Sequence, residues 1–268
     1  MMSSKRRGEI ARVLQDEGTI SIADLAQRLG VSLETIRRDV KPLTDEGVIV
    51  RTHGAVGLPQ HLGEAPFERR MRENASAKRA IARHVAGTIR SGDSIMLDTG
   101  TTTSFLAREL LHHRNLTVVT NSSDIARTLA TVNGNKVFMA GGELRSDNGA
   151  AFGAFAIDFV SRFNVAHAII SIGAIDATHG LMDYNLEEAE FARMVLSRGG
   201  RSVVVTDASK FGRHGLVQVC DFTGFDELVT DSSPPAVILE ALGRAGAKVN
   251  IVGEGARQET GGGQVAGG

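Results

Sequence analysis

The chain has 268 residues, of which 42% are hydrophobic, 23% are charged and only 4% are aromatic. This length fits one large domain or two ordinary ones, and the hydrophobic fraction excludes a chain that is disordered throughout. A single cysteine excludes a disulfide framework and any zinc site built from several cysteines. No apolar run reaches 18 residues, and the N-terminus lacks the apolar core of a secretory signal. We therefore expect a soluble cytoplasmic protein with no membrane partner.

The net charge of −1 conceals an asymmetry between the two ends of the chain. Residues 1–92 carry 16 Lys and Arg against 11 Asp and Glu, a net charge of +5, whereas residues 93–268 carry 14 against 20, a net charge of −6. A basic front permits a polyanionic partner such as DNA. Residues 1–60 alone hold 9 basic and 8 acidic side chains. DNA affinity must therefore depend on where a few basic side chains point, more than on bulk charge.

Residues 1–58 have the pattern of three short helices followed by a small β-ribbon. The second and third helices are joined by Gly30-Val31-Ser32, a tight turn that ends in a good N-cap. In the third helix the apolar residues Ile36, Val40 and Leu43 step by four and three, which marks one buried face. Two helices joined in this way and followed by a ribbon predict a winged helix-turn-helix, a module that reads DNA.

If that apolar face is buried, the basic side chains of the third helix point outward. Arginine can pair with a guanine edge or hold a phosphate, and a wing can touch the DNA backbone or minor groove. A helical bundle in which these arginines are only solvated fits the same pattern. The residues that we expect to contact DNA are Ser32, Thr35, Arg37, Arg38 and Lys41 on the helix, and Arg51 and His53 on the ribbon.

A proline lies inside the third helix. Pro42 lacks an amide donor and its ring clashes with the carbonyl of Arg38, which costs about 3 kcal/mol in a regular helix interior. We therefore expect a kink or a helix end near Val40.

Beyond a linker at residues 59–76, apolar strands alternate with helices up to residue 252. The strand-like runs are 94–98, 116–121, 136–140, 166–172, 201–206, 227–230 and 248–252. Helical patterns cover 103–111, 123–130, 186–197 and 234–242. This alternation predicts an α/β domain over residues 77–252, with a parallel sheet covered by helices on both faces. Residues 253–268 are Gly-rich and polar, and we expect a disordered tail.

Polar residues recur where the predicted strands end, which is the edge where ligands bind to parallel sheets. The run 98–104 follows one strand and opens a helix, so that its threonine hydroxyls and helix amides can surround an anion, while Asp98 can accept hydrogen bonds from polyol hydroxyls. The same residues can also be explained without a ligand. The threonines can cap a helix, and the helix dipole favours a glutamate near a helix N-terminus. The effector contacts that we expect are Asp98, Gly100, Thr101, Thr102, Thr103, Thr120, Asn121, Gly141, Gly142, Glu188 and Lys210.

These residues carry a resemblance to a known family. Residues 6–58 resemble the winged helix-turn-helix of the DeoR family of bacterial transcription regulators, through the run Val31-Ser32-Leu33-Glu34-Thr35-Ile36-Arg37-Arg38-Asp39-Val40. The usual His-Gly-Gly-Ala of that wing is His53-Gly54-Ala55-Val56 in this chain. Residues 65–252 resemble the family's effector domain, through Asp98–Thr102, Thr120-Asn121, Gly141-Gly142, Glu187-Glu188-Ala189 and Ser209-Lys210-Phe211.

The resemblance implies a fold and a function. The effector domain of the family resembles sugar-phosphate isomerases in fold. The implied protein is a DNA-binding repressor of double-stranded operators, relieved by a phosphorylated polyol or sugar, with glycerol 3-phosphate the first compound to test. A homo-oligomer, either a dimer or a tetramer, is expected because paired half-sites match paired subunits.

Two other functions fit parts of the sequence. An isomerase-like enzyme would use Asp98, Glu188 and Lys210 as acid and base groups. Against it, the chain has no P-loop, no Gly-x-Gly-x-x-Gly, no Gly-x-Ser-x-Gly and no zinc-protease motif, and its eight histidines are scattered, so we expect no catalysis, no cofactor and no metal. The second alternative is a protein-interaction module, which no specific motif in the sequence supports.

Overall fold

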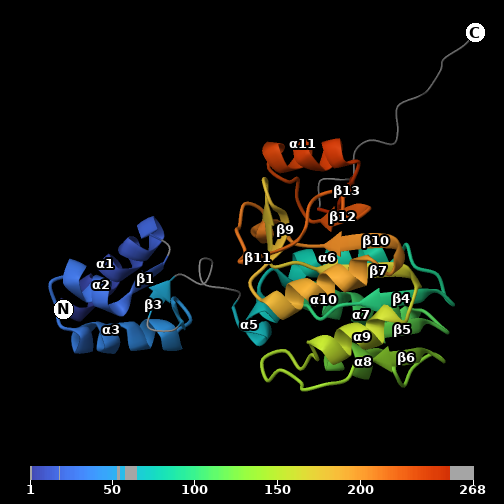
Figure 1. Ribbon diagram of the computed structural model, residues 1–268, viewed down its shortest axis with the longest axis horizontal. Helices are drawn as coiled ribbons and strands as arrows, with labels where there is room; N and C mark the ends of the chain where they lie inside the picture. Colours follow the sequence, from blue (N-terminus) through green and yellow to red (C-terminus); the bar gives the residue numbers. More distant parts are fainter. Residues whose placement is uncertain (1, 18, 53–54, 58–64, 254–268) are drawn as a thin grey trace, which may run out of the picture. The chain divides into compact units, whose positions relative to one another are not determined.

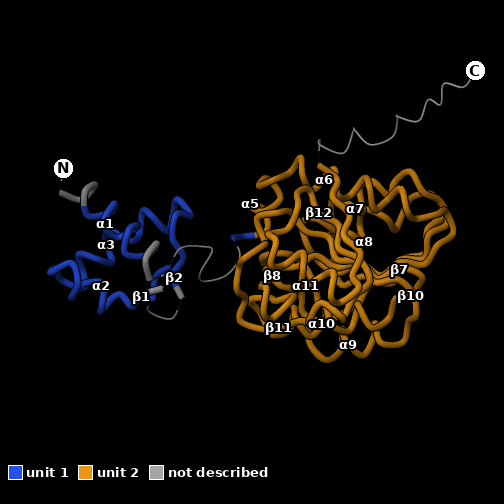
Figure 2. Tube along the Cα trace, turned by 90° about the horizontal axis from the view of Figure 1, so that it is seen from above, with its two compact units in different colours: residues 1–66 blue, residues 67–268 orange. Residues whose placement is uncertain are grey.

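A computed structural model describes residues 2–17, 19–52, 55–57 and 65–253, which belong to two compact units, residues 1–66 and 67–268 (Figures 1 and 2). Each unit has its own hydrophobic core. Among the described residues, no helix has the length and apolar character needed to cross a membrane. His53, residues 59–64 of the predicted linker and residues 254–268 of the predicted tail lie outside the described residues.

The first unit has the predicted helix-turn-helix and ribbon. Its elements are α1 (Met2–Glu17), β1 (Thr19–Ser21), α2 (Ile22–Arg28), α3 (Leu33–Asp45), β2 (Val50–Thr52) and β3 (Ala55–Gly57), and the strands pair antiparallel in the order β1-β3-β2. Ser32 caps α3, because its hydroxyl oxygen accepts a hydrogen bond from the amide of Thr35 at 3.2 Å. Ile36, Val40 and Leu43 are buried in the core of this unit, as the spacing predicts.

The expected helix end near Val40 is wrong, because α3 continues through Pro42 to Asp45. Val40 is 0% exposed and Leu43 is 8% exposed, and burying two such side chains stabilises the helix by about 1.5–3 kcal/mol each. The sum, about 3–6 kcal/mol, is at least as large as the cost of about 3 kcal/mol for an internal proline. Past the proline, the amide of Glu46 donates to the Pro42 carbonyl at 2.8 Å. Tertiary packing therefore overrides the local penalty.

The second unit is built on a fully parallel sheet. Within residues 65–253 its order is β13-β12-β10-β7-β4-β5-β6. The strands are β4 (Ser94–Leu97), β5 (Thr117–Thr120), β6 (Lys136–Met139), β7 (Val165–Ser171), β10 (Gly199–Val205), β12 (Glu227–Thr230) and β13 (Lys248–Ile251). Each coincides with one of the predicted strand-like runs. The predicted helical patterns correspond to α7 (Thr101–Glu109) with η1 (Leu110–His112), α8 (Ser123–Leu129), α10 (Leu186–Leu196) and α11 (Ala236–Ala245).

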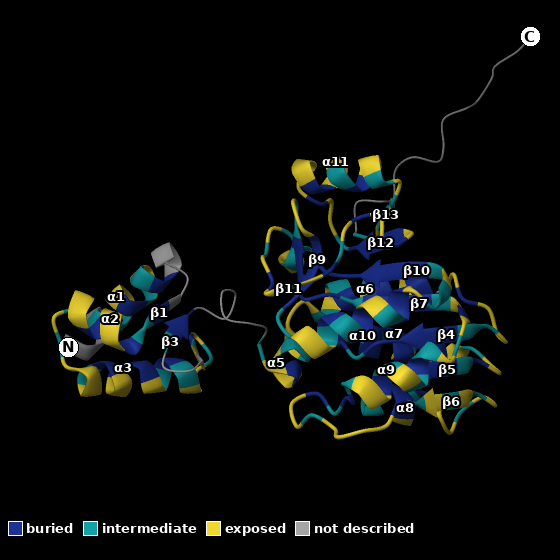
Figure 3. Ribbon diagram, in the orientation of Figure 1, coloured by how far each residue is buried: buried dark blue, intermediate teal, exposed yellow. Residues whose placement is uncertain are grey.

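Both faces of this sheet are covered, as predicted (Figure 3). Because side chains alternate along a strand, neighbouring residues belong to different cores. Ile95 and Leu97 of β4 pack with α6 (Ala75–Ala86), α7 and α8, whereas Met96 between them packs with α9 (Ala154–Ser161) and α10. The first of these cores contains Ile81 of α6 and the second contains Phe191 of α10.

Several elements have no counterpart in the sequence prediction. A second, antiparallel sheet has the order β11-β9-β8 and consists of β8 (Ala174–Asp176), β9 (Gly180–Asp183) and β11 (Val217–Cys220). A short helix, α5 (Phe67–Arg72), lies inside the predicted linker, and α6 and α9 are also additional. The second sheet packs on the α9–α10 side of the main sheet through Ile175, Leu181 and Val219.

Candidate functional site

The outward face of α3 carries the basic side chains expected there. Arg37, Arg38 and Lys41 are exposed, and Thr35 is half-buried with its hydroxyl oxygen 2.8 Å from that of Ser32. Arg37 lies 3.8 Å from the carboxylate of Glu34, but both side chains are more than half exposed, so this ion pair holds the arginine only weakly. The guanidinium groups of this face can therefore reorient toward a ligand.

An aspartate in the same helix fixes its position in the unit. Asp39 is only 2% exposed, and Nε of Arg6 in α1 donates to its carboxylate at 2.5 Å. A buried carboxylate requires such a partner, so this pair ties α1 to the inner side of α3. Sequence reasoning assigned no role to Asp39. Its position three residues after the buried Ile36 was the available signal, because that spacing returns to the same helix face.

The ribbon contributes one described basic residue. Arg51 is exposed on β2, where it pairs in register with Val56 of β3. The position of His53 cannot be compared with the prediction, because it lies outside the described residues.

In the second unit, Asp98 lies where the strand order of the main sheet reverses. The chain runs from β4 outward through β5 to β6, and then returns to β7 on the other side of β4. Ligands of open parallel sheets bind at such switch points. Asp98 follows β4 and is 6% exposed, and its two carboxyl oxygens accept from the amide of Ser171 at the end of β7, at 3.1 and 3.2 Å.

Gly100 packs directly against the same strand end. A Cβ atom at this position would lie 1.8 Å from Oγ of Ser171 and 2.8 Å from its Cβ, so no larger residue fits without a shift. Behind it, the Thr103 hydroxyl donates to the carbonyl groups of Asp98 (3.0 Å) and Gly100 (3.1 Å). Thr103 therefore holds this loop together, while Thr101 and Thr102 are also buried, at 5% and 4% exposure.

The end of β5 holds a long loop in place. The Asn121 amide nitrogen donates to the Ala151 carbonyl at 2.9 Å, and the amide of Ala151 donates back to the Asn121 carbonyl at 3.0 Å. The side-chain oxygen of Asn121 is buried and has no hydrogen-bond partner among the described residues. Thr120 is 0% exposed, and its hydroxyl oxygen accepts from the amide of Ser122. This anchored loop begins at the exposed Gly141 and Gly142.

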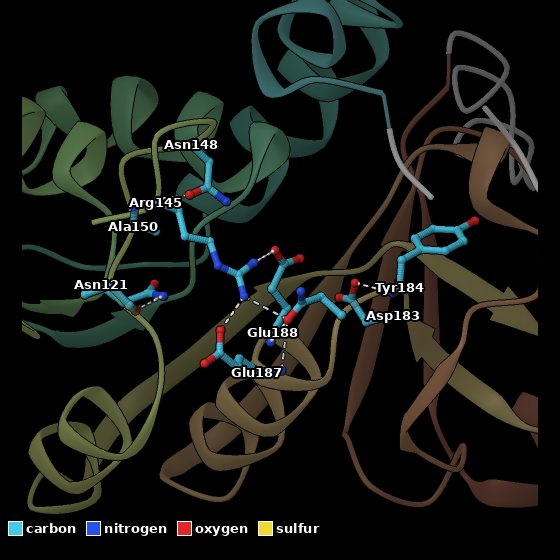
Figure 4. Close-up of polar contacts among 10 residues, drawn as sticks. Asn121, Arg145, Asn148, Ala150, Asp183, Tyr184, Glu187 and Glu188 are labelled. Carbon is cyan, nitrogen blue, oxygen red and sulfur yellow. Dashed lines mark hydrogen bonds and ion pairs between the residues drawn. The ribbon is translucent and has the colours of Figure 1, made fainter. Parts of the chain in front are cut away.

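The same loop carries Arg145, whose guanidinium donates to three side chains (Figure 4). Its guanidinium donates to Glu188 at 2.5 Å, to Glu187 at 2.6 Å and to the side-chain oxygen of Asn185 at 2.8 Å, and its centre lies 4.3 Å from the ring centroid of Phe152. Sequence reasoning did not select Arg145. It lies more than 40 residues from its carboxylate partners, and no local pattern marks it.

Carboxyl groups gather around Asp98. Burial raises the pKa of Asp98, the hydrogen bond from the Ser171 amide lowers it, and the charges of Asp183 and Glu188 raise it further, so that the net pKa is well above the usual range. Asp183, at the end of β9, is 7% exposed and was not among the predicted residues. Polar groups of this kind accept hydrogen bonds from the hydroxyl groups of a polyol.

Lys210 lies on a different part of the strand-end edge. It ends η2 (Ala208–Lys210), which follows β10 and is capped by Asp207. Asp207 also accepts from the side-chain amide of Asn74, between α5 and α6, at 2.8 Å. In the sheet, β10 and β6 are four positions apart, about 19 Å at 4.8 Å a strand. One small ligand cannot lie directly against both the end of β10 and Gly141 after β6.

Comparisons with known proteins agree with this architecture. A family model described as the DeoR-like helix-turn-helix domain matches residues 6–61, and one described as the DeoR C terminal sensor domain matches residues 73–232. The chain is 33% identical over 242 residues to the glycerol-3-phosphate regulon repressor of Escherichia coli, covering 90% of this chain and 96% of that protein. It is 34% identical over 235 residues to the transcriptional repressor AccR of Agrobacterium fabrum, covering 87% and 91% respectively.

Solved structures match the chain more weakly. Ribose 5-phosphate isomerase A of Methanocaldococcus jannaschii gives a TM-score of 0.38 at 16% identity, over 52% of this chain and 55% of that chain. The beta subunit of eIF2B from Chaetomium thermophilum gives 0.41 at 15% identity, over 60% and 50%. At these scores the likeness carries no conclusion about activity.

Proposed function

Because the chain belongs to the DeoR family of transcriptional regulators, we propose that it is a repressor whose hold on operator DNA is released by a phosphorylated polyol or sugar. The family model of the sensor domain covers more than half of the chain, and the similar proteins are named as repressors. These names support a regulator rather than an enzyme. The finer assignments below concern the DNA contacts and the effector.

The proposed DNA-reading surface is the exposed face of α3. Arg37, Arg38 and Lys41 carry it, with Thr35 near the start of the helix and Arg51 on the ribbon. Arginine side chains there can pair with base edges, while Thr35 and Arg51 are placed for phosphates. Ser32 contributes through the helix N-cap, whose free amides favour a phosphate. His53 stays in the proposal on sequence grounds alone.

The observation that carries the proposed effector class is the placement of Arg145. A guanidinium offers a planar set of donors that matches a phosphate, and this one lies in a cluster with Glu187 and Glu188, near Asp98. A phosphate would replace one carboxylate on Arg145, whereas the hydroxyl groups of the same molecule would donate to the carboxyl oxygens that remain. One cation beside several acceptors fits a small polyol that bears one phosphate.

The other predicted contacts have separate roles in the proposal. Gly100 lets the loop after β4 approach Ser171, and Thr101, Thr102 and Thr103 shape that loop and its helix N-terminus. The unpartnered oxygen of Asn121 is a further acceptor, beside Thr120. Gly141 and Gly142 begin the loop that carries Arg145, and Lys210 supplies a second positive charge for larger phosphorylated sugars.

A chain of hydrogen bonds supports a route from the effector residues to the linker. Asn74, in the turn between α5 and α6, donates to Asp207, which caps the helix of Lys210. The ammonium of Lys78 donates to the carbonyl groups of Arg70 and Glu73, so α5 is fastened to α6. Because α5 lies inside the predicted linker, a movement of the Lys210 loop would be passed to the residues that lead to the DNA-binding unit.

A paired arrangement of subunits completes the proposal. Helix-turn-helix proteins read two half-sites with two recognition helices, and an effector weakens such binding only if it prefers an arrangement of subunits that does not fit the operator. A dimer or a tetramer satisfies this requirement. Size-exclusion chromatography with light scattering measures the state directly.

The effector class is tested by a thermal-shift screen of the purified chain. Glycerol 3-phosphate is the first compound, followed by hexose phosphates, each beside its unphosphorylated counterpart. The proposal expects a phosphorylated compound to raise the Tm, because a ligand that binds only the folded state stabilises it. It also expects Arg145→Ala to reduce that rise, and Lys210→Ala to reduce it for hexose phosphates. Equal shifts with unphosphorylated compounds would contradict the assignment of Arg145.

The enzymatic alternative has one observation in its favour. Asp98 is a buried acid with a raised pKa close to Glu188, a combination found in acid–base catalysts. Glu188 is held by Arg145, however, and Lys210 follows a strand two positions from β4. Turnover of a sugar phosphate by the wild-type chain, lost in Glu188→Gln, would favour the enzyme.

A further inference from the structure

Outside the effector residues, the fold brings together two of the scattered histidines and one aspartate. Asp176 ends β8, His179 lies three residues later in the turn to β9, and His214 comes from the loop that follows η2. Nδ1 of His179 lies 2.8 Å from Oδ1 of Asp176, and Nδ1 of His214 lies 3.6 Å from Oδ2. One ligand atom from each of the three residues lies within 4.8 Å of the other two.

We propose that Asp176, His179 and His214 bind a divalent transition metal ion of the zinc type. Four donors about 2.0–2.2 Å from a tetrahedral Zn²⁺ are about 3.3–3.6 Å apart, and the observed separations of 2.8 and 3.6 Å bracket that value. Two imidazoles and one carboxylate are a ligand set that zinc accepts and that Mg²⁺ and Ca²⁺, which prefer oxygen, do not. Three protein ligands leave one position for water or another group.

The main chain holds these residues in place without the metal. Oδ1 of Asp176 accepts from the amides of Thr178 and His179, at 2.9 and 2.8 Å, so the carboxylate is fixed within its turn. On the other side, the amide of Gly212 donates to the carbonyl of Ile175 at 2.9 Å, two residues before His214. Both halves of the cluster are therefore positioned by backbone contacts next to the ligands, which lowers the ordering cost of binding.

The next residue after His214 confirms how closely this loop is packed. A Cβ atom on Gly215 would lie 2.7 Å from the carbonyl oxygen of Asp183 and 2.9 Å from its amide nitrogen. The loop thus packs closely against the end of β9, which constrains the backbone next to His214. The three side chains remain accessible, with exposures of 24% for Asp176, 51% for His179 and 62% for His214.

The hydrogen bonds within the cluster leave room for a metal ion. Nδ1 of His179 lies 2.8 Å from Oδ1 of Asp176. A carboxylate accepts only, so Nδ1 of His179 carries the hydrogen in the metal-free chain. A metal that takes that nitrogen requires the ring to carry its hydrogen on Nε2 instead. The carboxylate that loses this donor becomes a metal ligand.

Zinc alone is the probe for the test. The full chain, purified without a polyhistidine tag and stripped with a chelator, is titrated with Zn²⁺ in a calorimeter. We expect one site per chain, and at least about a tenfold loss of affinity in both His179→Ala and His214→Ala. His84→Ala, an exposed histidine on α6, and Cys220→Ser are controls that should bind as the wild type does. Mg²⁺ at the same concentration should not compete.

Three results would overturn the proposal: no zinc binding by the wild type, unchanged binding in His179→Ala and His214→Ala together, or loss of binding in Cys220→Ser alone. Far-ultraviolet circular dichroism checks that each variant is folded. If an alanine variant is unfolded, His179→Gln and His214→Gln replace it and must give the same loss. The proposal is independent of the effector, since zinc binding is measured with no other ligand present.

Discussion

Arg145 is the side chain whose replacement tests the effector residues most sharply. Arg145→Ala removes the hydrogen bonds to Glu187, Glu188 and Asn185, and it removes the contact with Phe152. It also leaves the Glu188 carboxylate, 25% exposed, without this cation. The loop that carries Arg145 keeps its backbone anchor at Asn121, so the second unit should still fold.

The expected cost to stability follows from burial. A charge-assisted hydrogen bond contributes about 1.5–3 kcal/mol, and the pair with the half-exposed Glu187 contributes less than about 1 kcal/mol. Together these give a loss of about 2–4 kcal/mol in the free energy of unfolding, or a fall in Tm of about 4–16 °C for a unit of this size. Effector binding should fall by at least about a hundredfold, which corresponds to about 2.8 kcal/mol.

Two measurements separate these effects. Thermal unfolding gives the stability change, and effector titration at a temperature where the variant is folded gives the affinity change. Arg162→Ala, which removes an exposed ion pair with Asp158 on α9, should change neither by more than about 0.5 kcal/mol. Arg145→Lys keeps the charge but loses the planar fork, so its affinity should be intermediate. If the effector released the Arg145→Ala variant from DNA as readily as it releases the wild type, the role of this residue would be refuted.

The remaining predictions concern packing, pH and DNA. Gly100→Ala should lower the Tm strongly because its Cβ would overlap Oγ of Ser171, and Ser171→Gly in the same chain should restore much of the loss; an unchanged Tm in the single variant would contradict this packing. Because burial raises the pKa of Asp98, the folded chain loses stability as the pH rises above about 4, the pKa of this group in the unfolded chain. Between pH 5 and pH 7.5, the free energy of unfolding in urea should therefore fall less in Asp98→Asn than in the wild type. An equal fall in both would contradict the prediction. Arg38→Ala should weaken operator binding at least tenfold in a gel shift, whereas Arg12→Ala, an exposed arginine on α1, should weaken it less; equal losses would remove α3 as the reading helix.

The main sheet was predictable because each of its strands is a short apolar run with its own local pattern. Ile95, Met96 and Leu97, for example, are consecutive and all buried, since both faces of the sheet are covered. The strands of the second sheet are only three or four residues long, and Gly180-Leu181-Met182-Asp183 has too little periodicity to be recognised. Helix α6 is rich in alanine and follows a proline-containing stretch, which hid its apolar face.

The candidate site was predictable only where its residues lie next to strands in the sequence. Asp98 and Asn121 are the last residues of two predicted strand-like runs, and the rule that ligands bind at strand ends was enough to select them. Arg145 and Asp183 belong to the same cluster through tertiary contacts across some 40 residues or more, which no local pattern reveals. The length of α3 also depends on tertiary packing, because burial of Val40 and Leu43 offsets the local cost of Pro42.

The central claim is that a small phosphorylated molecule releases this chain from DNA. A fluorescent duplex selected by the protein from random sequence, followed by anisotropy while glycerol 3-phosphate and hexose phosphates are added, measures that release directly. The account predicts that at least one phosphorylated polyol or sugar frees the duplex at a concentration where its unphosphorylated counterpart does not. A duplex that stays bound with every phosphorylated compound, or that unphosphorylated polyols release equally well, would contradict it.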